Sequence, residues 1–186
     1  AKMFYTLHRV VKWFFILLAL GTLAWLYTQR EALDPVWVWY DVYENGGLQR
    51  TEPVPTMQGE GTAVLDGHTF QIKSGGRIYS VRLTGFALPV PPLAPAELNL
   101  EKQRREVLRK MVLDKPVQVQ VTYSNQNSLL GIVRAGSTNL NTFFVARGLG
   151  EFNRAFVKSA PRDIQYSFFA ASRAHEKRHL LALKAE

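Results

Sequence analysis

The longest uninterrupted hydrophobic run lies near the start of the chain. Residues Trp13 to Gln29 carry no charged side chain and show no polar stripe of the kind that an amphipathic core helix displays. Such a helix rises about 25 Å, and Val10 and Val11 extend it toward the roughly 30 Å of a bilayer core. The pattern predicts a single transmembrane anchor within residues 1–30. A buried core helix and a cleaved signal peptide are the alternatives.

The basic residues around this run predict an orientation. Lys2, Arg9 and Lys12 precede the run, whereas Arg30 alone follows it at once. By the positive-inside rule the short N-terminus stays inside and the remainder lies outside. We therefore expect a single-pass protein of a bacterial inner membrane facing the periplasm, or of a mitochondrial inner membrane facing the intermembrane space.

A segment dense in aromatic residues follows the apolar run. It spans Val36 to Tyr43 and includes Trp37, Trp39 and Tyr40. Aromatic residues of this density are typical of a membrane interface or of a surface that contacts a partner protein. The alternative is an ordinary strand packed on its own domain. Glu52–Pro55 is expected to be extended, and residues 31–58 to form a linker.

Residues 59–186 alternate between patterns of short strands and patterns of helices. Val117–Val121 alternates strictly, as a half-buried strand does, and Ser74–Gly76 separates two runs that favour a hairpin. Further strands are expected at residues 59–66, 69–73, 77–83, 131–134 and 138–140. Helices are expected at residues 97–113, 141–148 and 163–183. These patterns predict a small α+β barrel carrying two to three helices.

The net charge differs between the two parts of the chain and limits the classes of partner that the basic part would bind. The 186 residues carry a net charge of +8, and residues 60–186 account for all of it. A basic domain suits nucleic acid, acidic lipid headgroups or an acidic protein. The chain has no cysteine, which excludes a disulfide scaffold, a thiolate zinc site, an iron–sulfur cluster and a cysteine nucleophile.

The order of the segments resembles the staphylococcal nuclease-like (thermonuclease) family over roughly residues 58–181. The points of likeness are Val64–Thr69, Val81–Pro89, Met111–Val112, Pro116–Val121, Asn139–Asn141 and Phe144–Leu149. The resemblance implies a five-stranded OB-fold barrel with helices. Members of this family cleave phosphodiesters. They use a calcium ion held by carboxylates, a further carboxylate that acts as general base on the attacking water, and two arginines that neutralise the phosphate.

The resemblance also implies that the catalytic site is degenerate. Asp66 and Arg82 match the family pattern, but His68 and Ala87 stand where metal-binding carboxylates belong. Val90 occupies the position of the general-base glutamate, and Leu130 occupies the position of the second arginine. Loss of one such group typically lowers the catalytic rate by a factor of about 10²–10⁴. We therefore expect no catalytic residue, no bound metal and no cofactor.

One further motif resembles a zinc-protease pattern. His175 to His179 reads H-E-x-x-H on a predicted helix. No third ligand follows in the remaining residues, and the neighbouring side chains are strongly basic. A solvated helix is the better interpretation.

These observations favour a non-enzymatic function. We expect a membrane-anchored, catalytically inactive nuclease-like domain that serves as an accessory or structural subunit of a larger membrane complex, of respiratory or photosynthetic type. Its partners would be other membrane subunits and the lipid bilayer, with no small-molecule substrate. One alternative is a membrane-tethered OB module that binds nucleic acid, and another is an active nuclease. Candidate partner or anion contacts are Trp37, Trp39, Tyr40, Arg104, Arg105 and Arg109.

Overall fold

The structure is a computed structural model that describes residues 13–22, 25, 34–46, 54–87, 94–158 and 160–183. The chain divides into two compact units, Ala1–Trp39 and Tyr40–Glu186. Each unit is considered by itself.

The predicted transmembrane helix is wrong. Residues 13–22 are helical, which corresponds to a rise of about 15 Å, or half of a bilayer core. Residues 23, 24 and 26–29 of the apolar run lie outside the described residues. In the part of the chain that the structure describes, none of the helices has both the length and the apolar character needed to cross a membrane. The membrane localisation and orientation deduced from this run are withdrawn with it.

The aromatic segment forms helix α2 (Asp34–Gly46), so the strand considered as an alternative is wrong. Val38 and Val42 are 3% and 4% exposed, a spacing of one helical turn, whereas Trp39 between them is 55% exposed. Asp34 lies in the first turn, where a carboxylate favours the helix dipole. Glu52 and Pro53 of the expected extended segment lie outside the described residues, as do residues 31–33 and 47–51 of the expected linker.

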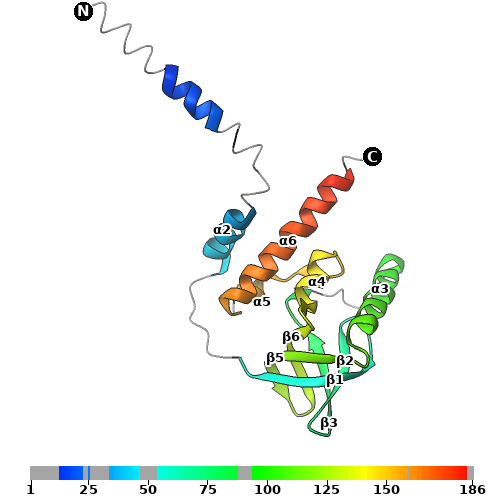
Figure 1. The fold of residues 1–186 in the computed structure, drawn as a ribbon. Coiled ribbons are helices and arrows are strands. Elements are labelled where there is room, and N and C mark those ends of the chain that lie inside the picture. Colours follow the sequence, from blue (N-terminus) through cyan, green and yellow to red (C-terminus); the bar gives the residue numbers. More distant parts are fainter. Residues whose placement is uncertain are drawn as a thin grey trace, which may run out of the picture. The chain divides into compact units, whose positions relative to one another are not determined.

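Five strands of the second unit close into a barrel (Figure 1). They are β1 (Thr56–Val64), β2 (Thr69–Ser74), β3 (Arg77–Leu83), β5 (Pro116–Asn125) and β6 (Ser128–Ala135). Strands β1, β2 and β3 form an antiparallel meander, β5 pairs with both β1 and β6, and a parallel pairing of β3 with β6 closes the ring. This closed barrel with helices fits an OB-like α+β domain, as the sequence predicts.

Alternation of side chains builds the barrel core. Val117 and Val119 are buried whereas Gln118 is exposed, which confirms the expected half-buried strand. The predicted β2–β3 hairpin is also present. Its turn residues Gly75 and Gly76 have φ values of 56° and 79°, the left-handed conformations that a tight hairpin turn requires.

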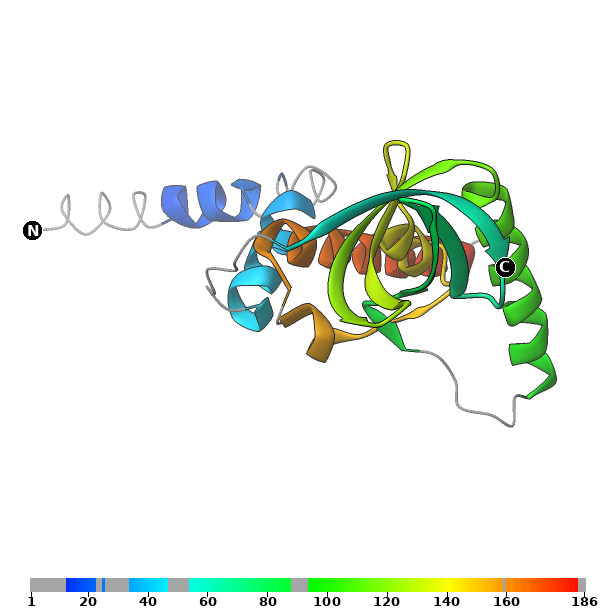
Figure 2. The ribbon, with the colours of Figure 1, turned by 90° about the horizontal axis from the view of Figure 1, so that it is seen from below.

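Helices and short strands surround the barrel. The helices are α3 (Pro95–Val112), α4 (Leu140–Ala146), α5 (Arg154–Lys158) and α6 (Arg162–Leu183). The short strands are β4 (Phe86–Ala87), β7 (Thr138–Asn139) and β8 (Glu151–Phe152). Figure 2 shows α3 beside the barrel, where it packs on β1, and α4 packs between β6 and α6. The long helices begin and end within two residues of their predicted bounds.

Buried Asn141 joins α4 to the barrel. Its Oδ1 accepts the Val133 N–H at 2.8 Å, and its Nδ2 donates to the carbonyls of Thr84 at 2.7 Å and Gly131 at 3.0 Å. The amide thus satisfies three backbone groups, two in β6 and one just after β3, in the way that a buried polar side chain must. The hydrogen bond to Thr84 fixes the end of β3, which lies between Arg82 and Ala87 in the chain.

Candidate functional site

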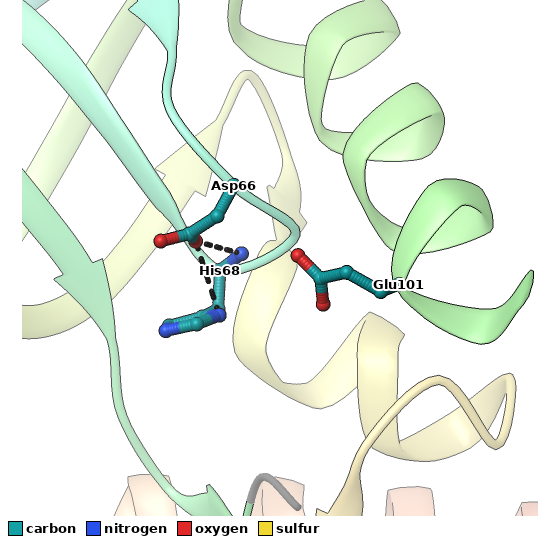
Figure 3. A group of neighbouring side chains, drawn as sticks. All are labelled: Asp66, His68 and Glu101. Atoms are coloured by element: carbon teal, nitrogen blue, oxygen red, sulfur yellow. Dashed lines mark hydrogen bonds and ion pairs between the residues drawn. The ribbon is translucent and has the colours of Figure 1, made fainter. Parts of the chain in front are cut away.

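The turn between β1 and β2 carries the first two residues that the nuclease resemblance singled out. Asp66 Oδ1 accepts the backbone N–H of His68 at 2.8 Å and lies 3.0 Å from His68 Nδ1 (Figure 3). The backbone N–H groups of Leu65 and Asp66 donate to the Thr69 carbonyl. The Asp66 carboxylate therefore holds the turn, which is a common use of aspartate. It also lies beside the imidazole, whose buried Nδ1 forms no hydrogen bond with the described residues.

Glu101 of α3 faces this turn from the other side. Its Oε1 accepts the Gly67 N–H at 2.5 Å, and its Oε2 lies 3.5 Å from Arg104 Nη1. A Cβ added at Gly67 would lie 2.6 Å from Arg104 Cβ and 2.7 Å from Glu101 Oε2. The absence of a side chain at Gly67 is therefore what lets the turn approach the helix so closely.

Arg104 is a buried cation, only 3% exposed. Its Nε donates to the Leu149 carbonyl, and its Nη2 lies 3.6 Å from Glu97 Oε2. A buried guanidinium requires such partners, because removing it from water without them costs several kcal/mol. Arg104 therefore ties α3 to the segment after α4 and does not fit the expected role of contacting an external anion.

The environment of His68 favours the neutral form of its imidazole. Burial lowers the pKa of His68 most strongly, and the positive charge of Arg82 lowers it further, whereas the carboxylate of Asp66 acts in the opposite direction. A neutral imidazole retains one ring nitrogen that can accept a hydrogen bond or bind a metal.

The three side chains offer a metal-ligating arrangement. One ligand atom each from Asp66, His68 and Glu101 lies within 4.8 Å of the others. Oxygen and imidazole ligands of this kind suit zinc or a similar transition metal. However, Asp66 and Glu101 already accept backbone N–H groups, and Arg104 lies 3.5 Å from Glu101. A cation bound here would share these carboxylates with two backbone N–H groups and with a guanidinium whose charge repels it, so the group fits a hydrogen-bonded junction better than a metal centre.

Sequence reasoning missed Glu101. Its usable signal was helical spacing, because Glu97 and Glu101 lie one turn apart and Arg104 lies three residues after Glu101. This spacing predicts that the two carboxylates and the guanidinium share one face.

The two positions implied for arginines lie side by side. Arg82 of β3 is in register with Leu130 of β6 across the parallel pair that closes the barrel. Arg82 is exposed and Leu130 is half-buried. The Leu83 N–H donates to the His68 carbonyl, so the turn also lies next to this pair. The structure thus brings His68, Arg82 and Leu130 into one region of the barrel surface.

The remaining predicted residues are spread more widely. Ala87 is exposed on β4, and Val90 lies outside the described residues. Arg105 and Arg109 are exposed on α3. Trp37 and Tyr40 are 47% and 43% exposed on α2. The Tyr40 hydroxyl donates to Glu44, and this hydrogen bond raises the pKa of Tyr40.

Comparison with known proteins gives no family assignment. No family model matches the chain. No curated protein matches it either. The strand pairing is therefore the evidence for the closed barrel, and no comparison supports a nuclease-like ancestry.

Proposed function

We propose that this protein is a catalytically inactive relative of the staphylococcal nuclease-like family that serves as an accessory subunit of a larger protein complex. One observation carries the inactive part of the proposal. Asp66 at the implied site, and Glu101, whose carboxylate lies within 4.8 Å of it, accept backbone N–H groups of the β1–β2 turn. They act as structural acceptors.

The chemistry of phosphodiester cleavage supports the same conclusion. That reaction needs a charged clamp on the phosphate and a base for the attacking water. The residue paired with Arg82 on the parallel strand is Leu130, which carries no charge. Ala87 has no side-chain atom that could bind a metal ion. A single exposed guanidinium attracts a phosphate but does not activate water.

Helix α2 supports a role in binding another protein. Its exposed large hydrophobic side chains are Val36, Trp37, Trp39, Tyr40 and Tyr43, each between 43% and 57% exposed. Tryptophan and tyrosine are enriched at protein–protein interfaces, where their large rings bury much area for little entropy. The proposed partner is therefore a protein that covers this aromatic face.

The test is purification of the full chain from its native cells under mild conditions. The proposal predicts a stoichiometric companion protein that is retained by the parent chain and lost with Trp37→Ser combined with Trp39→Ser. Tyr123→Ser is the matched control, because Tyr123 is 59% exposed on a barrel strand remote in sequence from α2. Recovery of the parent chain alone as a monomer would contradict the proposal, as would a companion unaffected by the α2 substitutions.

Binding of nucleic acid is a second candidate function, favoured by the exposed cations of α3. Lys102, Arg105 and Arg109 all lie on its exposed surface. Binding through phosphate contacts would weaken steeply with salt. The candidate predicts single-strand binding at low salt that Arg105→Ala combined with Arg109→Ala abolishes. Equal binding by parent and variant, or none, excludes it.

A further inference from the structure

The second unit contains a cavity of about 500 Å³ that none of the preceding roles uses. Its walls come from α3, from the segment that joins α4 to β8, and from α6. Ala87, the position at which the nuclease resemblance implies a metal carboxylate, also lines it. The cavity therefore lies beside the degenerate site and is open to a ligand of different chemistry.

Negative charge gathers around this cavity on an otherwise basic chain. Glu97, Glu151 and Glu176 line it, against Arg104, Arg154 and the imidazole of His175. Arg104 is also 3.5 Å from Glu101, which is not among the lining residues, so its charge is shared with a fourth carboxylate. The local balance is thus acidic, whereas the whole chain carries +8. A ligand drawn here by charge is a cation.

One carboxylate oxygen of this cavity forms a long ion pair but no hydrogen bond, although the Glu97 side chain as a whole is 36% exposed. Glu97 Oε2 is buried, and its nearest cation, Arg104 Nη2, lies 3.6 Å away, beyond good hydrogen-bond length. A buried acceptor in this state costs free energy until a donor reaches it. An ammonium or guanidinium group supplies N–H donors and a compensating charge together.

The other acids of the cavity remain available to such a group. Glu151 and Glu176 are exposed, and neither forms an ion pair with any residue that the structure describes. Glu176 Oε1 accepts only a long hydrogen bond, 3.4 Å, from Ser172. These two carboxylates can orient toward a cation without breaking an existing ion pair.

The cavity is also apolar enough to hold an alkyl chain. Leu100, Val145 and Phe152 line it together with the charged residues. Lysine and arginine bury their methylene groups against apolar surface while the charged end meets acids. The combination of an apolar wall and converging carboxylates matches this shape of side chain.

We propose that this cavity binds a lysine or arginine side chain presented by the partner protein. The inference rests on the proposed function, because it assigns a second contact to the same partner. Glu97 and Glu151 or Glu176 receive the charged end, and the apolar wall receives the methylene groups. A free amine metabolite shares this chemistry and is an outcome of the test.

The experiment is an NMR titration of the full chain with blocked amino acids. Blocked arginine and blocked lysine are expected to shift amides that line the cavity, with a dissociation constant of about 1 mM, as suits a single side chain. Blocked citrulline, the neutral isostere of arginine, is expected to bind at least about tenfold more weakly, a difference of about 1.4 kcal/mol. Equal shifts by citrulline and arginine would overturn the proposal, as would no shifts at all.

Two exposed substitutions test the acids without endangering the fold. Glu151→Gln combined with Glu176→Gln is expected to weaken arginine binding by about tenfold or more. Glu106→Gln is the matched control, because Glu106 is an exposed carboxylate of α3 that pairs with Lys110 at 3.4 Å and does not line the cavity. Equal weakening by the control would attribute the effect to net charge and would overturn the assignment.

Two comparisons separate this inference from the proposed function. If free agmatine binds much more tightly than blocked arginine, the cavity serves a metabolite and the partner contact is wrong. If the cavity variants bind arginine as the parent chain does while the companion protein still co-purifies, the inference fails and the proposed function stands. If blocked arginine binds and no companion co-purifies, the proposed function fails instead.

Discussion

Glu101 accepts the Gly67 N–H at 2.5 Å, across the contact between α3 and the β1–β2 turn. The carboxylate does so because Gly67 presents its backbone without a side chain in the way. This relationship converts a set of residues with metal-ligating chemistry into a structural junction. It is the basis of the inactive assignment and of the first prediction.

Gly67→Ala is expected to destabilise the protein by about 1–3 kcal/mol, the usual cost of forcing an extra methyl group into a packed site. The new Cβ would lie 2.6 Å from Arg104 Cβ, a distance that requires the helix or the turn to move. Denaturant unfolding measures the change. Gly136→Ala is the control, because Gly136 has a φ of 59° but open space around it, so backbone strain of about 1 kcal/mol acts there alone. A loss at Gly67 no larger than at Gly136 would count against the junction.

Arg104→Ala is expected to cost about 3–5 kcal/mol in the free energy of unfolding. The substitution removes a buried side chain together with its hydrogen bond to the Leu149 carbonyl, and it leaves the half-buried carboxylates of Glu97 and Glu101 without the cation that faces them. Arg105→Ala, its exposed neighbour, is expected to change stability by less than about 0.5 kcal/mol. Thermal and denaturant unfolding compare the two. Similar losses in both variants would refute a structural role for Arg104.

The position of Arg104 shows what the sequence could and could not predict. Arg104, Arg105 and Arg109 look equivalent as charges, and all were expected at the surface. The phase of the helix distinguishes them, because Arg104, Leu108 and Val112 follow one another at intervals of four and are all buried. The burial of Arg104 could not be predicted from the helical repeat alone, because it depends on the tertiary contact with the Leu149 carbonyl and on the ion pair with Glu97.

The barrel was easier to predict than the N-terminal region. Alternation at Val117–Val121 and the glycine pair at Gly75–Gly76 report local backbone geometry, so the strand and the hairpin follow from neighbouring residues alone. The apolar run at Trp13–Gln29 predicts a membrane span from hydrophobicity alone, and that prediction is wrong, because no helix in the part of the chain that the structure describes is long and apolar enough to cross a membrane. In α2 the alternation of valine with tryptophan resembles a strand, whereas the burial of Val38 and Val42 follows the helical repeat.

Acidification is expected to destabilise the protein through His68. Burial lowers the folded-state pKa below the unfolded value of about 6.5, so the unfolded chain binds the proton first. The contribution of neutral His68 is therefore complete above about pH 6.5 and is lost as the pH falls through the lower folded-state pKa. Unfolding free energies measured across this range should show a slope that His68→Gln removes. His179→Gln, an exposed control on α6, should keep the slope, and a slope unchanged in His68→Gln would contradict the assignment.

Divalent cations are expected to leave the stability of the protein unchanged. Zinc or calcium at Asp66, His68 and Glu101 would have to compete with the Gly67 and His68 N–H groups beside Arg104. A ligand that bound the folded state would raise the melting temperature with its concentration. Thermal unfolding with millimolar zinc, with calcium and with chelator should therefore give the same midpoint. A concentration-dependent rise that His68→Gln abolishes would establish a metal site and refute the closed junction.

The central claim, that the nuclease-like site is inactive, is tested most directly by digestion of single-stranded and duplex DNA and of RNA by the full chain. Reactions with calcium and with chelator are compared for the parent protein and for Arg82→Ala, since Arg82 is the exposed arginine at the implied site. The account predicts no cleavage above the chelated reaction and no difference between the two proteins. Calcium-dependent cleavage by the parent chain that Arg82→Ala abolishes would contradict it.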